Sequence, residues 1–201
     1  MRRSFLVLAL TLAGACRQVG DGVDAQASPP PQLPTRFDFG APVDSVKLAS
    51  IDIDANPSGV GLPAGSGTPA QGLQVYVSKC AMCHGAKGEG NVPGQTPPAP
   101  KLIGRDPREG FPFGRDPKAV KTVGNYWPHA TTIYDYVHRA MPLKNPGTLT
   151  PNETYAVVAY LLSENEIIGK DAVIDAKTLP AVKMPAAGRF VVDDRRGKTV
   201  R

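Results

Sequence analysis

The sequence predicts an all-α fold with long irregular extensions at both ends. Three stretches, at about residues 69–83, 130–139 and 151–163, carry apolar residues at helical spacing. Nearly all of the 21 glycines and 21 prolines lie outside these stretches, where they break regular structure. Only 41% of the 201 residues are hydrophobic, so we expect one domain with a small core.

Residues 1–16 are predicted to be a secretory signal peptide. Arg2 and Arg3 form its charged start, Phe5 to Leu12 its apolar run, and small residues follow at 13–15. The apolar run is too short to span a bilayer. The signal therefore predicts export to the periplasm.

Cys16 follows the small residues directly, which resembles the lipobox of bacterial lipoproteins, where the cysteine becomes the acylated first residue. Leu12 lies one place earlier than that pattern prefers, and Ala13 stands in its place. The alternative is ordinary cleavage, for example after Ala27, which would discard Cys16. Because Ala27 lies far beyond the apolar run, we favour a lipid-anchored protein in which Cys16 is acylated.

Residues 17–66 are predicted to form a tether followed by an N-terminal extension. The front of this stretch is rich in Pro, Gly, Ala and Asp, and we expect it to be a flexible linker. Residues 37–53 are more apolar, and we expect them to pack on the surface of the domain. Residues 56–67 hold four glycines and two prolines, which predicts a turn-rich connection.

The first predicted helix spans about residues 69–83. Thr68 suits the N-cap of this helix, and Pro69 suits its first position. Helical spacing predicts that one of its faces is buried. The residues of that face are Leu73, Tyr76, Val77 and Cys80.

This helix runs into the sequence Cys-Ala-Met-Cys-His at residues 80–84, which is the C-x-x-C-H attachment motif for c-type haem. Its thiols, Cys80 and Cys83, are predicted to bond covalently to the haem, and His84 is predicted to ligate the iron. A zinc site and a thioredoxin-like pair are the alternatives. The first needs further ligands, and the only other cysteine is Cys16. The second needs a βαβ pattern, which the sequence does not show.

Residues 85–114 are predicted to be a loop of glycine, proline and small residues that wraps the haem. One carbonyl oxygen of this loop is expected to accept a hydrogen bond from the second ring nitrogen of His84, which orients the imidazole. Pro100 is a candidate for this carbonyl, although the sequence does not single it out. The residues expected to pack on the haem are Pro98, Pro100, Leu102 and Ile103.

A second helix is predicted at about residues 130–139. The segment before it contains the only tryptophan, Trp127, whose ring N–H is a candidate donor to a haem propionate. Tyr126 and Arg105 are the other candidates for this contact. A packing role for Trp127 as a partly buried aromatic residue is an alternative of at least equal weight.

Haem iron bound by histidine commonly takes a methionine on its other side. We predict Met141 for this position. Because Met141 precedes Pro142, the chain should leave helical geometry there and present the thioether from an extended segment. Met1 is removed with the signal, and Met82 is tethered between the two haem-bearing cysteines.

Three alternatives to Met141 stay open. Met184 also precedes a proline, but it can reach the iron only if the C-terminal extension is ordered. His129 and His138 are the candidates for a second histidine ligand. His138 lies beside Arg139 on a helix, so we expect it at the surface.

The third helix, at about residues 151–163, has the clearest signals. Residues 150–153 read Thr-Pro-Asn-Glu, which fits a capping box with proline at the first helical position. The apolar face of the helix consists of Tyr155, Val158, Ala159, Leu161 and Leu162.

Residues 167–201 are predicted to form an irregular extension whose basic end is solvated and mobile, or else binds a partner.

The charge of the chain is mildly positive. Its formal net charge is +5, and without Arg2 and Arg3 it has 21 basic and 18 acidic residues. No dense basic stripe carries this excess, so nucleic acid is not expected as a partner. The charge is compatible with docking to a redox protein.

The order of helix, C-x-x-C-H, Gly/Pro loop, Met-Pro and closing helix resembles a class I cytochrome c over about residues 67–166. The resemblance implies a cytochrome c haem domain with one covalent haem c, in which the first and last helices cross. It carries over Cys80, Cys83, His84 and Met141 as haem-binding residues.

A narrower similarity is to the cytochrome subunits of bacterial sulfite and sulfane dehydrogenases. It implies a molybdenum-cofactor subunit as electron donor, and it places Met184 in a tail motif rather than at the iron. Some sulfane dehydrogenase cytochromes carry two haems, whereas this chain has one attachment motif, so the sulfite enzyme fits better. The matching stretches are residues 52–54, 59–67, 126–132, 135–136, 139–142, 175–176 and 183–185.

We therefore expect a monohaem electron carrier that receives electrons from a sulfite dehydrogenase and passes them to a downstream cytochrome or terminal oxidase. The chain shows no residues for sulfur chemistry or for molybdenum cofactor, so we do not expect an enzyme. One alternative is a carrier for another dehydrogenase, such as sulfane dehydrogenase. The others are a haem peroxidase that uses His129 or His138, and a gas sensor in which Met141 is displaced.

Overall fold

The part of the chain that the computed structural model describes comprises residues 32–33, 37 and 39–191. The predicted signal peptide with Cys16, most of the tether and the basic end at residues 192–201 lie outside it. The chain divides into two compact units, residues 1–42 and 43–201. Every helix and strand of the described part belongs to the second unit.

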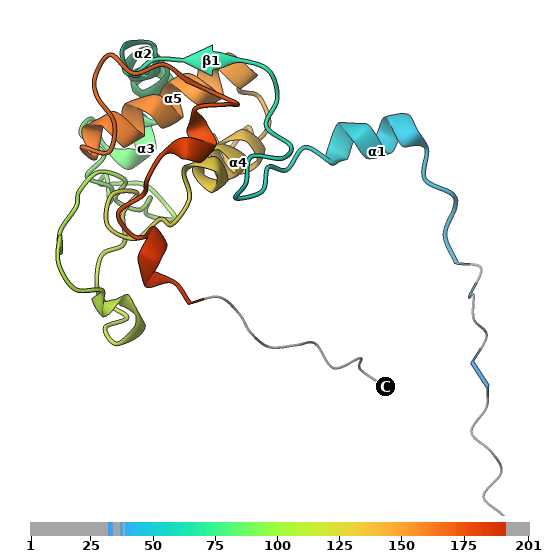
Figure 1. The fold of residues 1–201 in the computed structure, drawn as a ribbon, viewed down its shortest axis with the longest axis horizontal. Coiled ribbons are helices and arrows are strands. Elements are labelled where there is room, and N and C mark those ends of the chain that lie inside the picture. The colour runs from blue at the N-terminus through green and yellow to red at the C-terminus, as the bar shows by residue number, and fades with distance from the viewer. Residues whose placement is uncertain (1–31, 34–36, 38, 192–201) are drawn as a thin grey trace, which may run out of the picture. The chain divides into compact units, whose positions relative to one another are not determined.

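The described part is mostly helical, as predicted (Figure 1). Its helices are α1 (Ser45–Ile51), α2 (Pro69–Lys79), α3 (Ala81–His84), α4 (Ala130–Ala140) and α5 (Pro151–Glu164). The other elements are the strands β1 (Ser66–Gly67) and β2 (Ile174–Asp175) and the 3-10 turns η1 (Pro112–Gly114), η2 (Leu179–Ala181) and η3 (Ala187–Arg189). The first predicted helix is divided at Cys80, and the other two each extend one residue further than expected.

Helices α2 and α5 pack directly on each other and carry α3, β1 and α4 around them (Figure 1). Both begin with the predicted start signals. Thr68 and Gln71 form a capping box in α2, and Thr150 and Glu153 form one in α5. Each box satisfies backbone N–H groups that the first turn of a helix otherwise leaves unpaired.

The buried face of α2 differs from the predicted one. Tyr76 is buried as expected, but Leu73 and Val77 are exposed, and Pro69 and Gly72 are buried instead. Helix α5 approaches α2 on the side of Gly72 and Tyr76. Each residue advances about 100° around a helix. Leu73 and Val77, which directly follow Gly72 and Tyr76, therefore point toward solvent.

The larger core lies around α4, α5 and the C-terminal extension. Helix α5 is buried from Thr154 to Leu162 because α2 covers one of its sides while α4, β1 and β2 cover others. The buried residues of this core are Val123, Ala130, Ile133, Tyr134, Tyr155, Val158, Ala159, Leu162, Ile174, Leu179 and Met184.

The C-terminal extension is irregular, as predicted, but its apolar residues are buried. Strand β2 pairs with β1 in antiparallel register, with Ile174 opposite Gly67. Leu179, Met184 and Ala186 are almost fully buried. The extension, drawn in orange and red after α5 in Figure 1, therefore belongs to the folded domain at least as far as residue 186.

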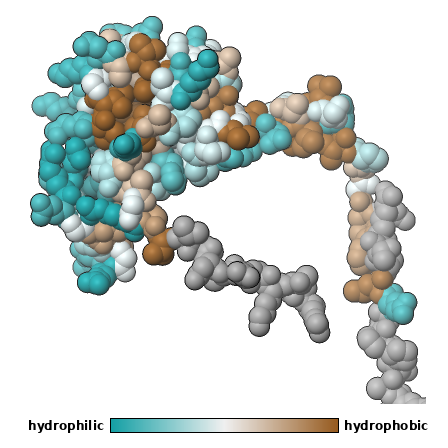
Figure 2. Space-filling model, viewed as in Figure 1, coloured by the Kyte–Doolittle hydropathy of each residue, from teal (hydrophilic) through white to brown (hydrophobic). Residues whose placement is uncertain are grey.

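Helix α1 buries none of its residues, so the expectation that residues 37–53 pack on the domain is wrong for this helix. The N-terminal extension instead enters the domain at Ala55, which is buried and donates its N–H to Asp135 at 2.8 Å. Within the described ranges, no helix is both long and apolar enough to cross a membrane. Figure 2 shows hydrophobic surface on α1, contributed by Val46, Leu48 and Ile51.

Candidate haem site

The C-x-x-C-H motif lies at a break between two helices. Helix α2 ends at Lys79, and α3 begins at Ala81. The N–H groups of Cys83 and His84 both donate to the carbonyl oxygen of Cys80, at 3.1 and 3.0 Å, so the motif forms one tight turn. Both thiols are free and half-buried. Since residues three apart on a helical turn lie on the same side, the two thiols can reach one flat group.

The environment of Cys80 suits a neutral sulfur. Burial raises the pKa of this thiol to about 11, so it is protonated at neutral pH. A zinc ligand or a redox-active cysteine needs a thiolate, which an apolar site disfavours. Among the described residues, no group of three or more His, Cys, Asp or Glu side chains is arranged to hold a metal ion. The surroundings of Cys80 therefore fit a thioether better than either alternative.

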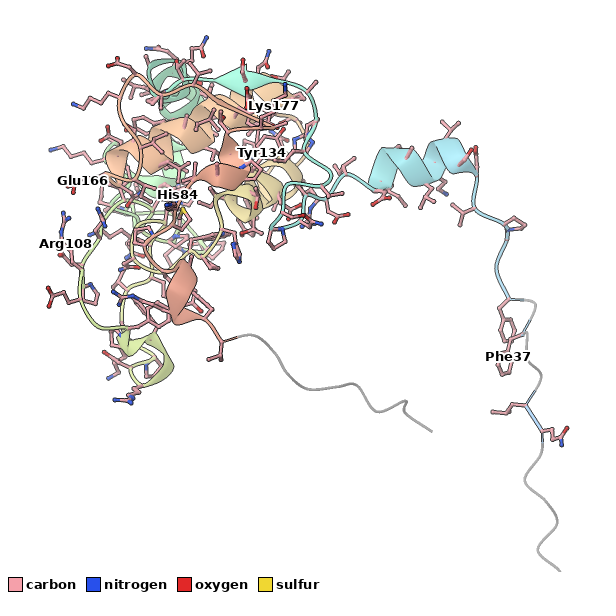
Figure 3. All side chains as sticks on the ribbon, in the orientation of Figure 1. Phe37, His84, Arg108, Tyr134, Glu166 and Lys177 are labelled. Atoms are coloured by element: carbon pink, nitrogen blue, oxygen red, sulfur yellow. The ribbon has the colours of Figure 1, made fainter. Side chains whose placement is uncertain are left out.

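The imidazole of His84 is oriented by a backbone carbonyl. Its Nδ1 lies 2.9 Å from the carbonyl oxygen of Pro100, so this nitrogen carries the hydrogen and donates it. The lone pair of Nε2 is then available to a metal. In Figure 3, His84 lies within the helical part of the domain, where the loop that follows the motif returns to it. This is the contact for which Pro100 was a candidate.

An apolar wall, formed by Ala81, Leu102, Ile103 and Val137, lies beside the motif. These four side chains and Cys80 pack against a smaller core, yet the protein covers each only in part. The buried residues of this smaller core are Tyr76, Val157, Tyr160 and Leu161. Their uncovered surfaces suit a large flat apolar group, so the residues present fit a haem. Pro98 and Pro100, the other residues predicted to pack on haem, are exposed.

Asn165 holds this wall to α5, and sequence reasoning missed it. This buried residue caps the C-terminus of α5. Its Oδ1 accepts the N–H of Gly104 at 2.8 Å, and its Nδ2 donates to the carbonyls of Leu102 at 3.2 Å and Leu161 at 2.8 Å. The segment that carries Leu102 is thereby fixed. The available signal was an asparagine just after a helix, which is common at helix ends.

Met141 lies where α4 ends. It is the C-cap, in extended geometry with φ −120° and ψ 150°, while its N–H still donates to Val137 at 3.1 Å. The helix therefore stops before Pro142, as predicted from the restriction that proline imposes on the preceding residue. The side chain of Met141 is half-buried. Its bond to iron stays a prediction.

The alternative ligands occupy different surroundings. Met184 is buried among apolar side chains of the larger core, which accounts for its presence without a metal. His129 is exposed at the N-cap of α4. His138 is half-buried rather than at the surface, because its ring packs against Tyr134 at a centroid distance of 5.6 Å. Its Nδ1 is buried and has no hydrogen-bond partner in the described part of the chain.

Two of the three candidates for a propionate contact, Trp127 and Arg105, donate hydrogen bonds within the protein. The ring N–H of Trp127 donates to Oγ1 of Thr132 at 2.8 Å. Arg105 donates to the carbonyl of Glu166 at 3.3 Å. The propionate contacts therefore stay predictions. Tyr126 packs in a cluster of rings with Phe111, Phe113 and Phe190.

A basic hollow adjoins Arg105. Arg105, Arg108 and Arg189 contribute to its lining. Arg108 forms an ion pair of 2.9 Å with Glu166, and Figure 3 shows the two side chains on the same side of the domain. Glu166 also pairs with Arg105 at 3.9 Å, and since three arginines line the hollow, it keeps an excess of positive charge. This charge suits a nearby anionic group, such as a haem carboxylate.

Residues 69–165 match the cytochrome c family model. The crystal structure of the sulfane dehydrogenase SoxCD from Paracoccus pantotrophus contains a chain with the same fold. The TM-score is 0.67 and the sequence identity 37%, over 80% of this chain and 74% of that one. The chain belongs to the cytochrome c family. With its C-x-x-C-H motif, it therefore binds haem c covalently through Cys80 and Cys83.

A second relative of this cytochrome is the thiosulfate dehydrogenase of Stutzerimonas stutzeri (strain A1501). The two are 30% identical over 101 residues, which is 50% of this chain and 29% of the relative. The cytochrome thus matches less than a third of that relative's length. The similarity to the SoxCD chain covers 80% of this chain, so it reaches beyond residues 69–165 into the extensions.

In this cytochrome the haem supplies one-electron chemistry, and the protein controls its surroundings. Cys80 and Cys83 fix the position of the group. The carbonyl of Pro100 orients His84 and makes its imidazole a stronger donor. The apolar wall would keep water from one side of a bound haem, which is one of the means by which a protein sets a reduction potential.

Proposed function

We propose that this cytochrome is a monohaem electron carrier of the periplasm, and that it accepts electrons from a molybdenum-containing dehydrogenase of sulfur compounds. The observation that carries the proposal is the imidazole of His84, which is oriented by Pro100 with Nε2 free. With Met141 as the opposite ligand, both axial positions of the iron would be filled. Such iron exchanges electrons and offers no position to a substrate, so the chain catalyses no reaction alone.

Sulfite is the substrate that we assign to the partner, because the chain has a single haem attachment motif. Sulfane dehydrogenase is the second candidate, favoured by the 37% identity with a chain of SoxCD. Thiosulfate dehydrogenase is the name of the second relative. Both relatives are named for the oxidation of sulfur compounds, so a partner of this class has broader support than any one substrate.

We propose that the N-terminal extension forms part of a permanent interface with the dehydrogenase subunit. Transient redox encounters bury less than about 1,200 Å² in total, whereas permanent subunits bury more. The exposed apolar residues of α1 can add such area, and the similarity to the SoxCD chain extends beyond the haem domain. Acylation of Cys16 would hold the assembly at the membrane, and a downstream cytochrome or terminal oxidase would take the electrons.

The proposal is tested on the exported protein, purified with the proteins bound to it. We expect molybdenum to co-purify, and the haem to be reduced when sulfite is added. Reduction by a sulfane substrate but not by sulfite would favour the second candidate. If molybdenum is absent and neither substrate reduces the haem, the proposal of a molybdenum-containing dehydrogenase as partner is refuted.

Two further measurements sharpen this test. Val46→Asp with Ile51→Asp in α1 should abolish co-purification of molybdenum, whereas Val173→Asp, at an exposed residue of the C-terminal extension, should not. The reduced protein should be indifferent to carbon monoxide, since both axial positions are filled. Binding of carbon monoxide to the wild type would instead favour a peroxidase or a gas sensor.

A further inference from the structure

A buried hydroxyl lies directly behind the turn that carries His84. The side chain of Tyr76 on α2 is fully buried, and its Oη donates a hydrogen bond of 2.8 Å to the carbonyl oxygen of Gly85. Gly85 is the residue that follows His84. A phenylalanine ring would fill the same space without a polar atom to satisfy, so packing alone does not account for the hydroxyl.

The backbone at Gly85 is held from several sides. Its φ of +83° lies in the left-handed region, and a Cβ there would come within 2.3 Å of the Glu89 carboxylate, so glycine is required. Its N–H donates to Ala81 at 2.9 Å, and its carbonyl also accepts the N–H of Gly88 at 3.2 Å. The bond from Tyr76 is the contact that ties this turn to a helix of the core.

The orientation of the His84 imidazole depends on the hydrogen bond to its ring and on the position of its backbone. Pro100 holds the ring at Nδ1, and the carbonyl of His84 accepts the N–H of Gly90 at 2.8 Å. The hydrogen bond from Tyr76 to Gly85 holds the backbone on the C-terminal side of His84. The ring of Tyr76 packs on Tyr160 of α5 at a centroid distance of 5.0 Å, which connects this contact to the crossing of α2 and α5.

We propose that Tyr76 is a positioning residue for the His84 ligand. Its hydroxyl fixes the carbonyl of Gly85, and through it the angle at which the imidazole meets the iron. The O–H dipole also directs its positive end toward the turn, which favours the reduced, less positive iron. This inference rests on the proposed role of His84 as an iron ligand. Burial raises the pKa of Tyr76, so the phenol stays a donor at neutral pH.

Tyr155→Phe provides a matched control for Tyr76→Phe. Tyr155 is also fully buried, and its hydroxyl donates a bond of 2.9 Å to the carbonyl of Pro63, in the N-terminal extension. Each variant therefore loses one buried bond from a hydroxyl to a carbonyl. Both should unfold at a lower temperature than the wild-type holoprotein. Only Tyr76→Phe should also lower the reduction potential and shift the electron paramagnetic resonance signals of the oxidised haem.

Equal potentials and equal resonance signals in the two variants would overturn the inference. The wild-type spectrum separates this outcome from failure of the proposed function: if its iron is not six-coordinate and low-spin, the carrier itself is refuted. Should Tyr76→Phe not fold, nuclear magnetic resonance of the reduced wild type provides the test. We then expect a slowly exchanging hydroxyl proton on Tyr76, and its absence would overturn the inference.

Discussion

Gly72 of α2 and Ala156 of α5 are in direct backbone contact, since a Cβ on Gly72 would lie 1.9 Å from the carbonyl oxygen of Ala156. The atoms that meet there belong to backbone, so they cannot move aside as a flexible side chain would. This crossing supports the cluster of Tyr76 and Tyr160, on which the apolar wall of the haem site packs. The haem site thus depends on a residue without a side chain.

Replacing Gly72 with Ala should destabilise the holoprotein by about 3 kcal/mol, because the added methyl group forces the two helices apart. The free energy of unfolding in denaturant measures this effect. Gly169→Ala is the control, since a Cβ at Gly169 would meet no atom within 4 Å. Equal stability of the two variants would mean that the crossing can relax, contrary to this account.

Replacing Met141 with Ala should open the second axial position of the iron. The reduced variant is then expected to bind carbon monoxide, as seen in its absorption spectrum, while the wild type does not. Met184→Ala serves as control, because Met184 is buried in the larger core. It should lower the free energy of unfolding by about 2–5 kcal/mol and leave the iron unreactive. The opposite pattern would assign Met184 to the iron.

Asn165→Ala should loosen the wall beside the haem. The change leaves the N–H of Gly104 without its partner and removes one of the two hydrogen bonds to the carbonyl of Leu102, at a cost of about 1–3 kcal/mol in the free energy of unfolding. Asn145→Ala is a matched control, since Asn145 is exposed and its side chain makes no hydrogen bond within the described ranges. A loss no greater than that of Asn145→Ala would refute the anchoring role.

Asp135 should make stability depend on pH. Its carboxylate accepts the N–H of Ala55 and pairs with Arg139, and the bond to Arg139 holds its pKa below the ordinary value. A carboxyl with a lower pKa in the folded state stabilises the fold above its ordinary pKa, and this stabilisation is lost as the pH falls through the folded-state pKa.

The wild type should therefore exceed Asp135→Asn in free energy of unfolding by about 1 kcal/mol at neutral pH. The difference should begin to shrink as the pH falls to about 4, the ordinary pKa of an aspartic acid, and should shrink further as the pH falls through the lower folded-state pKa. Denaturant unfolding at several pH values measures it. Asp171→Asn, at an exposed residue without a side-chain hydrogen bond in the described part, should show no such trend. A difference independent of pH would exclude the ion pair as its cause.

The helices were predictable because their signals are local. The capping boxes at Thr68 and Thr150 and the proline after Met141 act within one turn of the residues they affect. Which side of a helix is buried depends on its neighbour, and here the prediction for Leu73 and Val77 was wrong. Spacing marks a stripe of apolar residues, but the approach of α5 at Gly72 decided which side of α2 is covered.

The sequence by itself determined the covalent chemistry, because Cys80, Cys83 and His84 lie within a single turn, where spacing alone puts two thiols and an imidazole together. Only the tertiary structure decided how that imidazole is held. Its carbonyl partner, Pro100, is 16 residues away, and Asn165 anchors Gly104 from 61 residues away. Spacing within one element cannot predict such contacts, because they form only when the chain has folded back on itself.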